Sequence, residues 1–105
     1  MKIIDLEVLR ELSDDELAAQ GGITWSTDWK SISLSQSDCI SKATLATSQA
    51  GLSPQVSQYA VYAYTSDGNE AVTSCVAEKG LVYFFGAGYG DTPKVLVSAV
   101  YNNFG

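Results

Sequence analysis

The stretch QVSQYAVYAYTSDGNEAVTSCVAEKGLVYFFGAGYG, residues 55–90, decides the fold. It holds three runs rich in β-branched and aromatic residues, at 55–65, 70–78 and 81–90. Runs of this composition favour β-strands, and the Asp67-Gly68 pair between the first two predicts a hairpin because glycine tolerates positive φ. The KG pair before the third run predicts another tight turn. We therefore expect three antiparallel strands here.

Before this stretch, residues 23–34 alternate in a way that predicts one more strand. Trp29, Ser31 and Ser33 fall on one side, opposite Lys30, Ile32 and Leu34. Ser35 and Asp38 then fit a capping box that opens a helix over 36–50, with Gly51 just past its end. The inner face of that helix is expected at Cys39 or Ile40, Ala43, Ala46 or Thr47, and Ala50.

After the third strand, Asp91 or Thr92 can cap a last helix that has Pro93 at its first position. Its apolar side is expected at Val95, Leu96, Ala99, Val100 and Phe104. Residues 23–105 thus read β-α-β-β-β-α. This order predicts an α+β domain whose antiparallel sheet is covered on one face by two helices.

Charge is distributed unevenly along the chain. The formal net charge is −6, of which residues 1–22 carry −4 through six acidic and two basic side chains, so −2 remains for residues 23–105. The latter part has four lysines and no arginine, which argues against nucleic-acid binding through phosphate contacts. Its acidic balance also argues against direct membrane insertion, which usually needs a cationic amphipathic helix.

Residues 1–22 have the pattern of an amphipathic helix, with Ile3, Leu6, Leu9 and Leu12 at helical spacing. The helix is expected to end at Gly21-Gly22. One interpretation is an ordinary N-terminal helix that packs on the domain and ends in a glycine cap.

The segment ELSDDELAAQGG, residues 11–22, resembles the double-glycine leaders of bacteriocin-type precursors through Leu12, Ser13, Glu16, Leu17, Gly21 and Gly22. The resemblance implies a bacterial precursor that is secreted after the peptidase domain of an ABC exporter cuts behind Gly22. It assigns leader recognition to Leu6, Leu9, Leu12, Ser13, Glu16 and Leu17. The chain then divides into a leader, 1–22, and a cargo domain, 23–105. In layout, the cargo resembles small exported α+β domains of unknown role.

Cys39 and Cys75 flank 35 residues, and neither belongs to a C-x-x-C motif. If the cargo is exported, a disulfide between them is the favoured interpretation. The alternative is two buried thiols that act as small hydrophobic groups. With no histidine in the chain, a metal site is not expected.

Catalysis is not expected either, because there is no histidine to act as a general base and no recognisable nucleophile motif. The segment GAGYGD, residues 86–91, lacks the third glycine and the lysine of phosphate-binding loops, so we interpret its glycines as a tight strand-to-helix turn. No cofactor is expected.

Aromatic residues are the remaining candidates for a binding role. Tyr62 and Tyr64 share one face of the strand predicted at 55–65, with Tyr59 on the other, and an uncovered row of tyrosines suits a protein or glycan target. Packing in the core or in a dimer interface is the alternative.

Taken together, the leader resemblance, the lack of catalytic groups and the tyrosines predict an exported, non-enzymatic effector or binding protein. The other hypothesis is an intracellular structural or protein-interaction module that retains its N-terminal helix.

Overall fold

The computed structural model describes residues 23–105, which form a five-stranded antiparallel sheet and two α-helices. In chain order the elements are β1 (Ile23–Ser31), α3 (Gln36–Gln49), β2 (Gln55–Val56), β3 (Ala60–Tyr64), β4 (Glu70–Val76), the 3-10 turn η1 (Ala77–Lys79), β5 (Leu81–Tyr89) and α4 (Thr92–Phe104). The strands lie in the order β1-β5-β4-β3-β2, and every neighbouring pair is antiparallel. The α+β class is confirmed. The leader helix, its recognition residues and the Gly21-Gly22 cleavage site lie outside the described residues.

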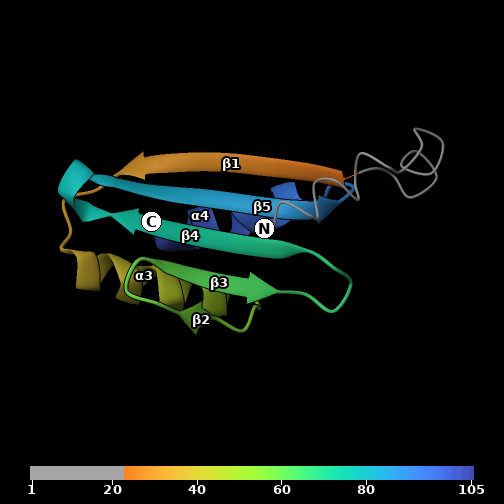
Figure 1. Ribbon diagram of the computed structural model, residues 1–105, viewed down its shortest axis with the longest axis horizontal. Coiled ribbons are helices and arrows are strands. Elements are labelled where there is room, and N and C mark those ends of the chain that lie inside the picture. Colours follow the sequence, from red (N-terminus) through yellow and green to blue (C-terminus); the bar gives the residue numbers. More distant parts are fainter. Residues whose placement is uncertain (1–22) are drawn as a thin grey trace, which may run out of the picture.

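Both helices lie behind the sheet on the same face, as Figure 1 shows. Helix α4 packs mainly on β5 and β1, α3 packs mainly on β3 and β4, and the two helices also contact each other. The predicted cover of one face by two helices is therefore confirmed. The termination of α3 is also as expected, since Gly51 has a φ of 85° just past its end.

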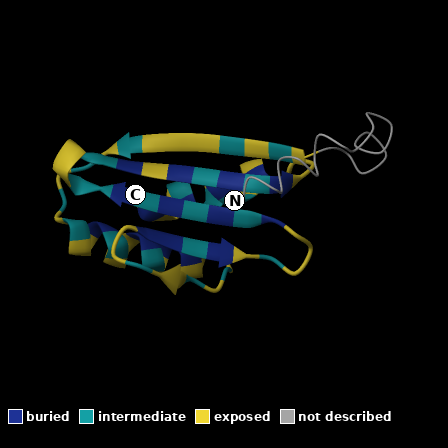
Figure 2. Ribbon diagram, in the orientation of Figure 1, coloured by how far each residue is buried: buried dark blue, intermediate teal, exposed yellow. Residues whose placement is uncertain are grey.

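The hydrophobic core lies between the sheet and the helices. Alternate residues of β4 and β5 are buried, which gives these strands the banded pattern in Figure 2. From α3 the buried residues are Cys39, Ala43, Ala46 and Thr47, all on the predicted inner face. Small side chains on α3 allow the helix to lie close to the sheet. Phe84 fills the centre, with edge-on contacts to the rings of Tyr101 and Phe104.

The inner face of α4 agrees with the prediction at Val100 and Phe104 but differs from it at Val95. Its buried residues are Pro93, Val97, Val100 and Phe104, whereas Val95 is 62% exposed. The helix lies close to the sheet at Gly86, where an added Cβ would lie 2.7 Å from the carbonyl oxygen of Pro93. This contact turns Pro93 and Val97 toward the sheet, and Val95 consequently points to solvent.

One predicted strand is in fact two. The run at 55–65 breaks into β2 and β3, so the order becomes β-α-β-β-β-β-α. Ser57 makes the break: its backbone N–H donates to the Ala60 carbonyl at 2.9 Å, and its hydroxyl accepts the backbone N–H of Tyr59 and of Ala60. A serine side chain that bonds the backbone in this way stabilises a turn in place of a continued strand.

The helix starts were predicted in part. Ser35 caps α3 as expected, because its hydroxyl accepts the backbone N–H of Asp38 at 3.2 Å. Asp91 precedes α4 but makes no side-chain cap, and it contributes its carbonyl to the N–H of Val95 instead. Pro93 occupies the first turn, where a missing N–H costs nothing.

A disulfide joins Cys39, in the first turn of α3, to Cys75 in β4. Both residues are buried within the core cluster, and the sequence separation is 36 residues. The predicted pairing of the two cysteines is thus present, and no free cysteine remains. The bond fixes the start of α3 to the middle of the sheet.

Candidate binding face

The sheet face opposite the helices is the candidate functional site, and we call it the open face. Figure 1 looks directly onto it. Because side chains alternate along a strand, the pairing registers assign its members. They are Ile23, Trp25, Thr27, Trp29 and Ser31 of β1; Leu81, Tyr83, Phe85, Ala87 and Tyr89 of β5; Glu70, Val72, Ser74 and Val76 of β4; Ala60, Tyr62 and Tyr64 of β3; and Gln55 of β2.

Aromatic side chains dominate the open face. The register places Trp29 beside Tyr83 and Thr27 beside Phe85, so aromatic residues of β1 and β5 are direct or diagonal neighbours. Several are largely exposed: Trp25 at 71%, Tyr64 at 58%, Trp29 at 54% and Tyr83 at 48%. Large aromatic groups on one uncovered surface are typical of interaction sites.

Tyr62 and Tyr64 both lie on the open face, as predicted. Tyr64 is exposed, whereas Tyr62 is half-buried beside the β2–β3 turn, with its hydroxyl 3.4 Å from that of Ser57. The prediction for Tyr59 is wrong, because this residue lies in the turn and not on the far side of a strand. The sequence interpretation also missed Trp25 and Trp29 as members of the face. Their i, i+4 spacing on one strand was the available signal.

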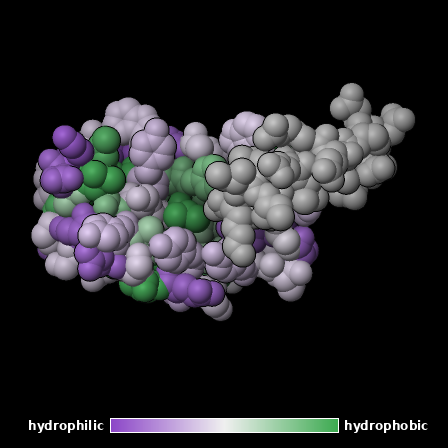
Figure 3. Space-filling model, in the orientation of Figure 1, coloured by the Kyte–Doolittle hydropathy of each residue, from purple (hydrophilic) through white to green (hydrophobic). Residues whose placement is uncertain are grey.

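The open face is nearly free of charge. Glu70 is its one ionisable acidic or basic side chain, since the acidic and basic residues of β1 turn the other way. Lys30, for example, donates to the Tyr101 carbonyl on the helix side and lies 3.9 Å from the centre of the Tyr101 ring. In Figure 3 strongly hydrophilic residues gather toward the ends and lower edge of this side, with apolar and intermediate residues between them.

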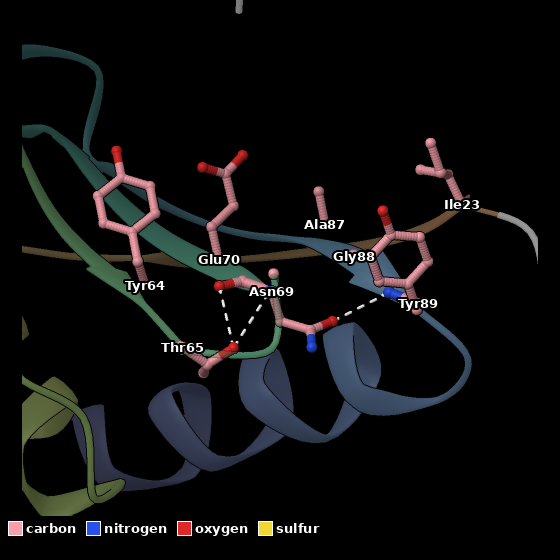
Figure 4. A pocket seen from close by; sticks show the side chains of 9 residues that line it. Ile23, Tyr64, Thr65, Asn69, Glu70, Ala87, Gly88 and Tyr89 are labelled. Carbon is pink, nitrogen blue, oxygen red and sulfur yellow. Dashed lines mark hydrogen bonds between the residues drawn. The ribbon is translucent and has the colours of Figure 1, made fainter. Parts of the chain in front are cut away.

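A hollow of about 260 Å³ lies at one end of the open face, at the β3–β4 turn, and we call it the Glu70 hollow. Figure 4 shows the side chains of Tyr64, Glu70, Ala87 and Tyr89 standing on the same side of the sheet around it. Ala87 and Gly88 leave its floor low because they have little or no side chain. Two phenol rings and one carboxylate therefore surround a space open to solvent.

Asn69 fixes the position of this hollow from below. Its side-chain oxygen accepts the backbone N–H of Tyr89 at 2.9 Å, and only 4% of the residue is exposed. Gly88 makes room for it: an added Cβ there would lie 1.8 Å from the same oxygen. A residue with a side chain at position 88 would therefore break the link between the hairpin and β5.

The turn beside the hollow is held by a small polar network. The Thr65 hydroxyl donates to the Asp67 carboxylate, and the Asn69 amide donates to the same carboxylate at 3.1 Å. These hydrogen bonds lower the pKa of Asp67 below its ordinary value of 3.8, and the hydrogen bond from Thr65 has the largest effect. The predicted Asp67-Gly68 turn is confirmed, with Gly68 at a φ of 89°.

Strand β1 forms one edge of the sheet. The N–H of Ile32 points toward the β5 side, where it bonds the Gly80 carbonyl, so alternation directs the N–H of Trp29 outward. The Asp28 carboxylate accepts this outward N–H at 2.8 Å. A charged group on an edge strand opposes pairing with another strand. The edge is therefore protected, and the flat open face is the better surface for a partner.

Other classes of site find little support in residues 23–105. No cluster of three or more Cys, Asp or Glu residues capable of holding a metal occurs there. Neither α3 nor α4 has the length and apolarity needed to cross a bilayer. Comparison of the chain with protein-family models, curated proteins and solved structures finds no match.

Proposed function

We propose that this protein is the precursor of a small exported, non-enzymatic binding protein or effector of the bacteriocin-like kind, and that its open face contacts a protein outside the producing cell. The aromatic surface of β1, β3 and β5, which no other element of residues 23–105 covers, is the observation that carries the binding role. Its largest exposed members are Trp25, Trp29, Tyr64 and Tyr83. Tryptophan and tyrosine are the residues that most often dominate the energy of protein interfaces.

Export is supported by two further features. The resemblance of residues 11–22 to double-glycine leaders supports an export signal in this segment and a cleavage site behind Gly22. The Cys39–Cys75 disulfide is compatible with an oxidising compartment, where such bonds form and persist. A leader-processing ABC exporter is accordingly the first partner, and the protein target is the second.

Processing is tested by expressing the full chain with a peptidase-containing ABC exporter and mapping the N-terminus of secreted material. We expect secreted protein to begin at Ile23. Gly22→Val is the matched variant, because a cleft that fits only glycine next to the cut should reject it. Secreted wild-type protein beginning at Met1 would refute the proposed cleavage.

Removal of residues 1–22 distinguishes this proposal from an intracellular module with a retained helix. Under the proposal residues 1–22 are a detachable leader, so we expect the truncated chain, residues 23–105, to lose less than about 1 kcal/mol of its free energy of unfolding. Under the alternative, four or five buried aliphatic side chains would be lost, at about 1.5–3 kcal/mol each. Urea unfolding of both chains, followed by circular dichroism, measures the difference.

A further inference from the structure

We propose that the Glu70 hollow is a subsite for a cationic side chain, lysine or arginine, presented by the protein partner. This inference rests on the proposed role of the open face and adds the chemistry of the group that binds at one end of it. The observations that carry it are the charge of the face, the geometry of the hollow and its rigid base.

The charge of the open face selects a cation. Glu70 is half-buried in the sheet surface and is the sole acidic or basic side chain on that face. The four lysines of residues 23–105 lie elsewhere: Lys30 on the helix side of β1, Lys42 on α3, Lys79 in η1 and Lys94 on α4. A partner that covers the face removes water from a carboxylate that none of these lysines can neutralise. Such a burial is costly unless the partner supplies the opposite charge.

The spacing of the two tyrosines also fits a cation. Tyr64 pairs with Glu70, Glu70 pairs with Ala87, and Tyr89 lies two residues beyond Ala87. With strand spacings of about 4.8 Å and a rise of about 3.4 Å per residue, the Cα atoms of Tyr64 and Tyr89 lie roughly 12 Å apart, with Glu70 between them. A cation held at Glu70 is thus near both rings, and cations bind tyrosine within about 6 Å of the ring centre.

The hollow supplies hydrogen-bond acceptors to match. The Glu70 carboxylate only accepts, and the hydroxyls of Tyr64 and Tyr89 can accept as well. Ammonium and guanidinium groups only donate, so they are complementary to the acceptors of the hollow. The rigid base provided by Asn69 and Gly88 holds Tyr89 in place without the ligand. The exposed Tyr64 ring can change rotamer to present its face.

The test is an NMR titration of the ¹⁵N-labelled full chain with N-acetyl-arginine methylamide, using the neutral citrulline analogue as the matched probe. We expect saturable shifts of the amides of Glu70, Ala87 and Tyr89 with the arginine probe. The citrulline probe should bind at least five-fold more weakly. Glu70→Gln should weaken binding of the arginine probe by a similar factor while leaving the melting temperature unchanged.

Tyr64→Leu should also weaken binding. Tyr59→Leu is its matched control, since Tyr59 is an exposed tyrosine in the β2–β3 turn, outside the hollow, and its loss should leave binding of the arginine probe within two-fold of wild type. Equal binding of the two probes, or of the arginine probe to Glu70→Gln, overturns the subsite. Indole, which mimics an aromatic side chain of a partner, serves as a third probe. If the arginine probe does not bind but indole shifts the amides of Trp25 and Trp29, the cation subsite is refuted and the proposed binding role of the open face is supported. If no probe shifts any amide of the open face, both proposals fall.

Discussion

Loss of the Cys39–Cys75 disulfide should destabilise the protein by about 4 kcal/mol. The bond closes a sequence separation of 36 residues. In the chain-entropy relation, a loop of this size restricts the unfolded chain by about 13 cal/mol/K, or about 3.8 kcal/mol at 25 °C. Small domains have a total stability of about 5–15 kcal/mol, so the bond supplies a large share of it. We expect the melting temperature to fall by roughly 15–30 °C.

The assay compares the wild type with Cys39→Ala/Cys75→Ala in urea, followed by far-ultraviolet circular dichroism. Alanine is chosen because both cysteines are buried, at 0% and 3% exposure, and a small apolar residue leaves no unpaired polar group there. Intact mass before and after reduction first establishes that the wild type is oxidised. Reduced wild type should lose a similar amount of stability. A double variant within about 1 kcal/mol of the oxidised wild type would contradict the entropic argument.

Three further changes test the surroundings of the open face. Gly88→Ala should lower the free energy of unfolding by about 3 kcal/mol or more, because it breaks a buried hydrogen bond and strains the backbone at a φ of 157°. Gly90→Ala is the control: its φ is 59° with open space around it, so the same urea assay should show a loss of only about 1–2 kcal/mol. Asp28→Thr should free the edge of β1, and sedimentation should show more self-association than in wild type, a result that equal sedimentation would exclude. The pKa of Asp67 is lowered in the folded state, so its contribution to stability is present above the ordinary value of 3.8 and is lost as the pH falls through the folded value. Urea unfolding at pH about 6 and about 3 should therefore show a smaller acid-induced loss in Asp67→Asn than in wild type, and equal losses would contradict the assignment.

Local signals predicted most of the fold. The alternation in β4 and β5, the Asp67-Gly68 turn and the Ser35 cap each depend on residues a few positions apart, which the sequence displays directly. The break at Ser57 was missed because one hydroxyl that bonds two backbone N–H groups overrides the strand propensity of its neighbours. The face of α4 was misassigned because it depends on a tertiary contact, the approach of Pro93 to Gly86.

The open face was harder to predict because it depends on pairings between distant parts of the chain. Trp29 is 54 positions from its partner Tyr83, and no local pattern specifies that register. The Glu70 hollow depends on three strands at once, since Tyr64, Glu70 and Ala87 each come from a different one. Sequence alone could place Tyr62 and Tyr64 on one face of a strand. It could not place a carboxylate between Tyr64 and Tyr89.

The disulfide and the open face are linked through the stability of a small domain. Within residues 23–105 the helices cover only one face of the sheet, and in a small domain of this kind a disulfide supplies a large share of the stability. With the Cys39–Cys75 bond in place, the helix side of the sheet can supply the stability, and the aromatic side is free to evolve for binding. Trp25→Ser and Trp29→Ser should accordingly change stability by no more than about 0.5 kcal/mol each, as is usual for exposed positions. A cost of several kcal/mol would show that the open face serves folding and would contradict its proposed role in binding a partner.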